Sequence, residues 1–239
     1  MFKSFQDNSS LQQFHSFPNL NMQQATSAYG FSGVTFWLDA AYGLNTQTNL
    51  GAVSSWQQRV GGGTFVQGTA GSQPRLVLND ANYNNFPSVE TVSVGRFMSA
   101  SLGLKFNQNV TVAVISKVNT AQALNSIMGG ATSEGIVDGG TSAGFNGFGY
   151  YLTTTMQGQG TTESVNPRIK ILTINSVIIN GVLENTFTIN RVAELISLFR
   201  VASTDMAGSI AEIIAFGYSM TSDEAIALSN NINQKYAIY

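Results

Sequence analysis

Between residues 31 and 217 the sequence is a succession of short runs rich in β-branched and aromatic residues, each ended by glycine, asparagine, serine or proline. The run NVTVAVISKV (109–118) alternates, so that its successive valines face one side of an extended chain while Thr111 and Ala113 face the other. Asn180-Gly181, between SVII and VLEN, suits a two-residue hairpin turn because both positions tolerate a positive φ. Short strands joined by tight turns predict an antiparallel β protein.

One helix is predicted, at the end of the chain. Thr221 and Glu224 have the spacing of a capping box, in which the hydroxyl accepts from the glutamate amide and the glutamate reaches back. An apolar stripe at helical spacing follows: Ala225, Leu228, Ile232 and Tyr236. Together the patterns predict an all-β fold class, an antiparallel two-sheet jelly-roll sandwich with one C-terminal α-helix. The glycine-rich stretches 61–63, 129–149 and 158–160 are predicted to be loops.

Composition excludes several function classes. Charged residues are only 10% of the 239 residues and the net charge is −2, so no basic field attracts nucleic acid or an anionic membrane. The absence of cysteine and the single histidine, His15, exclude disulfides, cysteine-ligated zinc and histidine-rich metal sites. We expect no metal, no cofactor, no nucleic-acid partner and no membrane insertion. The first residues lack the apolar stretch of a signal peptide, so we expect synthesis and folding in a cytosol.

The composition divides the chain into an N-terminal arm, residues 1–30, and a jelly-roll domain, residues 31–239. The arm has no helical or strand period, yet it carries phenylalanines among glutamine, asparagine and serine: Phe2, Phe5, Phe14 and Phe17. Aromatic side chains often anchor a peptide in a groove. Two interpretations stay open: a terminus that frays or lies along its own domain, and an assembly arm that docks on a neighbouring subunit.

Motifs at both ends of the domain resemble one family. WLDA (37–40) is followed by VSSW (53–56), Gln67 and QP (73–74), and the chain closes with GSIAEIIAFGYSMTSDEAIALSNNINQKY (208–236). This order resembles the concanavalin A-like jelly-roll domain of the laminin-G-like group, over about residues 31–236. The resemblance implies the sandwich fold. The family includes lectins, glycosidases, adhesins and structural modules, so the fold does not give the function.

Several motif residues have both a structural and a functional interpretation. Trp37 and Trp56 stand in regular apolar context, and we expect them in the core rather than as platforms for sugar rings. We expect Asp39 to cap the turn after its strand rather than to bind calcium. The family often has an aspartate where Gln58 stands, and its loss weakens a calcium site. Glu212 recurs in the family, and we expect it to bond a loop backbone or an arginine rather than to catalyse a reaction.

Glycoside hydrolysis needs two carboxyl groups roughly 5–9.5 Å apart. The jelly-roll glucanases place them on a strand with the pattern E-x-D-x-x-E, and none of the 13 acids here follows it. The nearest pair, Glu134 and Asp138, lies in a glycine-rich stretch. A Ser-His-Asp triad would have to use His15, in the arm. We therefore expect that the chain is not an enzyme.

The best candidate for ligand binding is the stretch GGATSEGIVDGGTSAGFNGFGYY (129–151). It offers the carboxylate, amide and aromatic groups with which proteins recognise sugars: Asp138, Phe145, Asn146, Phe148 and Tyr150. Loops on a rigid scaffold commonly carry function. The other interpretation is an irregular strand pair whose aromatics fill the sandwich.

Low charge, a composition rich in asparagine, glutamine, glycine and threonine, and an aromatic arm favour a subunit that packs into a particle assembled inside a cell. The first interpretation is a non-catalytic structural protein of a bacteriophage virion (capsid decoration, head fibre or tail-associated subunit), made in the host cytoplasm. It would join other virion proteins through residues 1–30, form a homo-oligomer, and direct the jelly roll toward cell-surface glycans. The alternative is a stand-alone carbohydrate-binding or adhesion module. A third interpretation is an enzyme whose site carries no recognised motif.

Overall fold

The computed structural model describes residues 27–239 except for short internal gaps: 94, 108, 120–124, 131–133, 143–144, 153–154, 158–164, 190–192 and 202–203. It describes only the backbone at residues 139–142, 145–146, 152, 155–157 and 204. The predicted arm residues Phe2, Phe5, Phe14 and Phe17 therefore lie outside the described residues, as do the side chains of Phe145 and Asn146.

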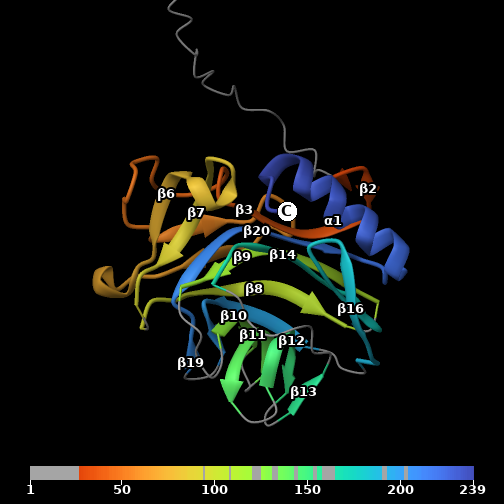
Figure 1. Ribbon diagram of the computed structural model, residues 1–239. Coiled ribbons are helices and arrows are strands. Elements are labelled where there is room, and N and C mark those ends of the chain that lie inside the picture. The colour runs from red at the N-terminus through yellow and green to blue at the C-terminus, as the bar shows by residue number, and fades with distance from the viewer. Residues whose placement is uncertain are drawn as a thin grey trace, which may run out of the picture.

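Two antiparallel sheets pack face to face (Figure 1). The helix-side sheet has the order β16-β15-β14-β9-β20-β7-β6, with β3 also paired to β20. Its strands are β3 (Val34–Asp39), β6 (Arg75–Asp80), β7 (Phe86–Thr91), β9 (Thr111–Val118), β14 (Arg168–Leu172), β15 (Ser176–Ile179), β16 (Val182–Thr186) and β20 (Gly208–Phe216). The predicted all-β antiparallel sandwich is confirmed.

The far sheet has the order β13-β12-β11-β10-β17-β8-β5-β4. Its strands are β4 (Ser55–Gln57), β5 (Thr64–Val66), β8 (Met98–Phe106), β10 (Asn125–Gly130), β11 (Glu134–Ser142), β12 (Phe145–Leu152), β13 (Thr155–Gln157) and β17 (Ala193–Leu198). Smaller elements complete the chain: β1 (Ser27–Ala28), β2 (Phe31–Ser32), η1 (Ala70–Ser72), η2 (Ala81–Tyr83), β18 (Arg200–Val201), β19 (Thr204–Asp205) and α1 (Ser222–Tyr236).

Strand β9 shows how the alternating sequence builds two apolar layers. Val112 and Val114 belong to the core between the two sheets, whereas Ala113 and Ile115 belong to a second core on the opposite face of the helix-side sheet. This is the face division that the sequence predicts. A strand that is apolar on both faces needs a cover on each side, and α1 provides the second cover.

Helix α1 lies across the outer face of the helix-side sheet (Figure 1). The predicted capping box is present: Thr221 Oγ1 accepts from the Glu224 amide (3.3 Å) and Glu224 Oε2 accepts from the Thr221 amide (2.8 Å). The predicted stripe is buried against the sheet: Ala225, Leu228, Ile232 and Tyr236. In the part of the chain that the structure describes, no helix is long and apolar enough to span a membrane.

The part of the chain that packs in the core beneath α1 begins before residue 31. β1 and β2 pair as a short hairpin, with Ala28 opposite Phe31. Ala28 is buried in the core beneath α1, and Tyr29 packs against the same core. Residues 27–30, assigned to the arm from composition, thus pack with the sandwich.

The predicted turn at Asn180-Gly181 is confirmed. Its residues have φ of 50° and 76°, and Ile179 pairs with Val182 across it. The glycine-rich stretch 129–149, in contrast, is not the loop that the sequence predicts, because most of it lies in β10, β11 and β12. A Cβ on Gly135 would lie 2.1 Å from the carbonyl oxygen of Met128. Glycine there permits close contact between neighbouring strands and does not mark a chain reversal.

Candidate functional site

The predicted glycan residues whose side chains are described do not reach the surface. Asp138, Phe148 and Tyr150 are each 0% exposed and face the interior between the two sheets. The Tyr150 ring stacks on Phe106 with centroids 4.6 Å apart, and Asp138 forms an ion pair with Lys170. A glycan outside the sandwich cannot contact these three side chains, so their assignment to a glycan site is wrong. The other interpretation, a strand pair whose aromatics fill the sandwich, holds for Phe148 and Tyr150.

The motif residues of β3 and β4 are structural, as expected. Trp37 is 8% exposed and Trp56 is fully buried. Asp39 Oδ1 accepts from the amide of Ala41 (2.9 Å) and so caps the turn after β3. Its other oxygen pairs with Arg59 (3.4 Å), whose guanidinium lies 4.2 Å from the Trp37 ring centroid.

Glu212 of β20 joins helix α1 to the N-terminal hairpin and β3, whose residues Tyr29 and Trp37 lie 183 and 175 residues away in sequence. Its Oε1 accepts from Trp37 Nε1 of β3 (2.6 Å), and its Oε2 accepts from the hydroxyls of Tyr29 and Tyr236 (both 2.6 Å). Lys235 Nζ lies 3.2 Å from Oε2. Glu212 is structural, as expected, but its partners are side chains of β3, the N-terminal hairpin and α1 rather than a loop backbone or an arginine.

Burial controls the ionisation of this cluster. Desolvation raises the pKa of Glu212, and the neighbouring Lys235 ammonium partly offsets that rise. Desolvation also raises the pKa of Tyr236 well above its usual value, and the nearby Glu212 raises it further. With Glu212 fully buried and bonded on both oxygens, the cluster presents no carboxylate to a substrate.

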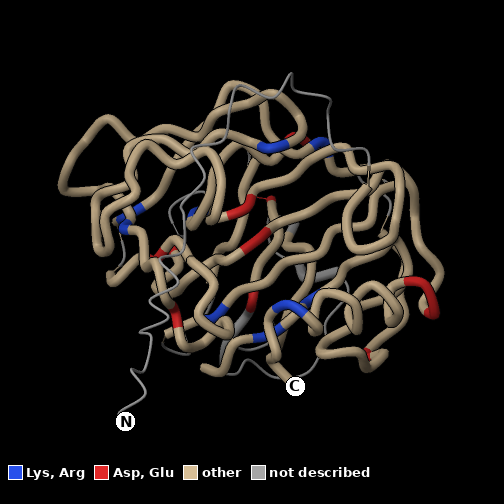
Figure 2. Tube along the Cα trace, turned by 90° about the horizontal axis from the view of Figure 1, so that it is seen from above, with Lys and Arg blue, Asp and Glu red and all other residues tan. Residues whose placement is uncertain are grey.

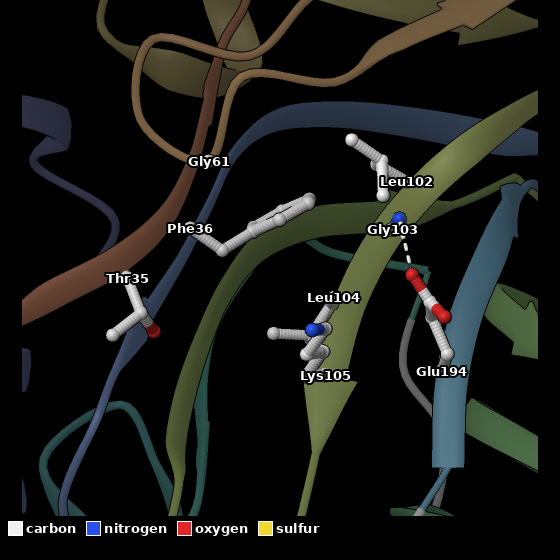
Figure 3. A pocket seen from close by; sticks show the side chains of 8 residues that line it. All are labelled: Thr35, Phe36, Gly61, Leu102, Gly103, Leu104, Lys105 and Glu194. Carbon is white, nitrogen blue, oxygen red and sulfur yellow. Dashed lines mark hydrogen bonds between the residues drawn. The ribbon is translucent and has the colours of Figure 1, made fainter.

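A surface hollow of about 290 Å³ lies where the two sheets meet, between β3 and β8 (Figure 3). Apolar side chains from both strands line it: Phe36, Leu102 and Leu104. Leu102 is 52% exposed, whereas Phe36 and Leu104 are 2% and 1% exposed. Of these three side chains, Leu102 is therefore the one that meets solvent.

Polar groups surround this apolar floor. Thr35 lies at one side, and Lys105 and Glu194 lie at the other, opposite each other on β8 and β17. Glu194 Oε1 accepts from the amide of Gly103 (3.2 Å), which holds the carboxylate against the rim (Figure 3). All three side chains are exposed, so they can exchange bonds to water for bonds to a ligand.

Two glycines shape the hollow. Gly61 has a φ of 108°, and a Cβ there would lie 2.1 Å from Gln58 Oε1. A Cβ on Gly103 would lie 1.9 Å from the Leu195 carbonyl oxygen. These two backbone segments can therefore pack against Gln58 and Leu195 only because they carry no side chains.

An apolar floor with a hydroxyl, an ammonium and a carboxylate at its rim suits a ligand that has a carbon-rich face and several hydroxyl groups. No sequence pattern predicts this site, because Gly103 and Glu194 are 91 residues apart and neither belongs to a recognisable motif. Among the described residues, no group of three or more histidine, cysteine, aspartate or glutamate side chains could hold a metal ion. Charges of both signs are interspersed along the trace (Figure 2).

No model of a known protein family matches the chain, and no curated protein matches it. Solved structures do match. Domain 4 of AbnA, an extracellular GH43 arabinanase from Geobacillus stearothermophilus in complex with arabinotriose, is 13% identical, with a TM-score of 0.56 over 83% of this chain and 100% of that one. An arabinofuranosidase complexed with arabinofuranosyl-alpha-1,2-xylobiose is 12% identical, with a TM-score of 0.58 over 87% of this chain.

Trypanosoma rangeli sialidase in complex with 2,3-difluorosialic acid is 11% identical, with a TM-score of 0.50 over 87% of this chain. The chain spans 60% of the arabinofuranosidase and 34% of the sialidase, but all of the arabinanase domain. At these identities the likeness shows the fold alone, a β-sandwich that also occurs within larger glycoside-processing proteins.

Proposed function

We propose that this chain is a non-catalytic carbohydrate-binding domain whose ligand occupies the hollow between β3 and β8. The observation that carries the proposal is the combination of the exposed apolar side chain of Leu102, which lies beside the buried Phe36 and Leu104, with the polar rim of Thr35, Lys105 and Glu194. A sugar ring has the matching surfaces, a C–H face and a circle of hydroxyl groups.

The size of the hollow limits what it holds. Its volume of about 290 Å³ lies just below the range for small-molecule pockets, roughly 300–1,000 Å³. We expect it to accept one sugar unit at a chain end or branch of a glycan. Lys105 favours a sugar that carries a carboxylate or several acceptor oxygens on the side facing β8.

The lining of the hollow also supports the non-catalytic part of the proposal. Glycoside hydrolysis by the usual route uses two carboxyl groups across the scissile bond. Glu194 is the sole carboxylate that lines the hollow among the described residues. The two sandwich matches that were solved with arabinose-containing ligands support a carbohydrate ligand without identifying it.

Glycan arrays, including arabinan, xylan and sialoside fragments, provide the test, followed by calorimetry on any ligand found. Glu194→Ala should weaken binding at least about tenfold, the loss expected for one charge-assisted hydrogen bond. Glu184→Ala, on β16 outside the hollow, is the matched control and should bind as the parent chain does. Equal binding by both variants would show that the ligand does not bind in the hollow.

We further propose that the domain is a subunit of a bacteriophage virion, held there through residues 1–30 and assembled as a homo-oligomer, with the sandwich directed toward cell-surface glycans. The aromatic residues of this segment support the proposal: Phe2, Phe5, Phe14 and Phe17. The expected result is that the chain co-sediments with intact particles at a fixed copy ratio. A chain lacking residues 1–26 should fold and leave the particle, and full-length protein found only at the top of the gradient would reject this placement.

A further inference from the structure

A lysine and an aspartate are buried together between the two sheets. Lys170 of β14 is 1% exposed and Asp138 of β11 is 0% exposed. The ammonium Nζ of Lys170 donates to Oδ2 of Asp138. β14 belongs to the helix-side sheet and β11 to the far sheet, so this pair joins the two layers through the core.

The surroundings of the pair supply little polar compensation. Lys170 Nζ lies 3.1 Å from Ser116 Oγ, and the Phe148 ring centroid lies 6.0 Å from Nζ. Oδ1 of Asp138 is buried and has no hydrogen-bond partner among the described residues. A buried carboxylate normally has partners for both oxygens, because removing a charge from water is costly. An ion pair in which one carboxylate oxygen has no partner therefore links the two sheets at a high cost in desolvation free energy.

We propose that Lys170 and Asp138 condense into an intramolecular isopeptide bond. Within the pair, the ammonium passes one proton to the carboxylate, leaving a neutral amine and a neutral carboxylic acid. The amine attacks Cγ of Asp138 and forms the Nζ–Cγ bond. A proton then moves from nitrogen to the departing hydroxyl, the C–O bond breaks, and one water leaves. The balance is one amine and one carboxylic acid giving one amide and one water, with no change in oxidation state.

The site provides what this reaction needs. The fold holds nucleophile and electrophile in contact, which replaces the entropy cost of an encounter. A lysine amine removed from water is a stronger nucleophile than a solvated ammonium. The Ser116 hydroxyl is placed to bond Nζ and to carry a proton during the transfer. The product is a neutral amide, so both buried charges disappear and the unpartnered oxygen no longer carries charge.

The intact mass of the purified full-length chain tests the proposal. It should lie one water below the mass calculated from the sequence. Trypsin should leave a branched peptide in which the segments around Asp138 and Lys170 are joined. A chain with the full calculated mass, whose tryptic peptides at both residues are linear, would overturn the proposal. This measurement needs no variant, so it decides the matter even where a variant fails to fold.

Two substitutions distinguish the amide from an ion pair. Lys170→Arg removes the nucleophilic amine but keeps a cation, so its mass should be the full calculated value. Asp138→Asn removes the carboxylate that takes the lysine proton, so its mass should also be the full calculated value. A Lys170→Arg or Asp138→Asn chain that still lies one water below its calculated mass would place the bond elsewhere.

Discussion

Replacing Glu212 with alanine should lower the free energy of unfolding by about 3–5 kcal/mol, which makes this one of the two most damaging substitutions we predict. The carboxylate receives hydrogen bonds from Trp37 Nε1 and from the Tyr236 hydroxyl, and both donors are nearly fully buried. Each donor left without a partner costs about 1–3 kcal/mol. Lys235 adds little, because its side chain is 23% exposed and can turn to water.

Urea denaturation, followed by tryptophan fluorescence, measures this loss. Asp223→Asn is the control, because it removes a carboxylate from the exposed start of α1 and should change stability by less than about 1 kcal/mol. Glu212→Gln should fall between the two, since its amide keeps one acceptor oxygen. A Glu212→Ala chain as stable as the control would show that this carboxylate does not hold β3, the N-terminal hairpin and α1 together.

Replacing Tyr150 with alanine should also cost about 3–5 kcal/mol, the range for deleting a buried aromatic side chain. Tyr150 is fully buried, and its ring lies parallel to that of Phe106, with an interplanar angle of 8°. The alanine would leave a cavity between the two sheets and remove the stacked ring pair. The same denaturation experiment measures the loss.

Tyr150→Phe separates the ring from its hydroxyl, which donates to Glu134 at 3.3 Å. This variant keeps the packing and should lose no more than about 1.5 kcal/mol. The two variants, Tyr150→Ala and Tyr150→Phe, also test the sequence-based assignment of Tyr150 to a glycan site. A Tyr150→Ala chain of parent stability that no longer bound a glycan would contradict the buried position and restore that assignment.

Local patterns predict much of the fold. The Thr221–Glu224 capping box, the Asn180-Gly181 turn and the valine alternation of 109–118 each depend on contacts within a few residues. The sequence carries these in full, and all three are present. The closing motif of the chain likewise predicts the strand that carries Glu212 and the helix that covers it.

Contacts between distant strands could not be predicted in this way. Gly135 looks like part of a flexible loop until a neighbouring backbone is placed 2.1 Å from where its Cβ would stand. Asp138 looks like a surface acid until Lys170, 32 residues away, is placed beside it in the core. The hollow is missed for the same reason, since Lys105 and Glu194 meet only when β8 pairs with β17. Single-sequence patterns contain no information on such pairings.

The position of β20 has a consequence for how the protein is made. This strand pairs with β9, β7 and β3, so it occupies the middle of the helix-side sheet, yet it is the last strand of the chain. The helix-side sheet cannot close before residues 208–216 have been synthesised. Until then β9 and β3 have unpaired edges, the kind of surface on which nascent chains aggregate or recruit chaperones. This sheet is thus expected to close only after β20 has been made, and any product truncated before residue 208 lacks the strand that unites the sheet.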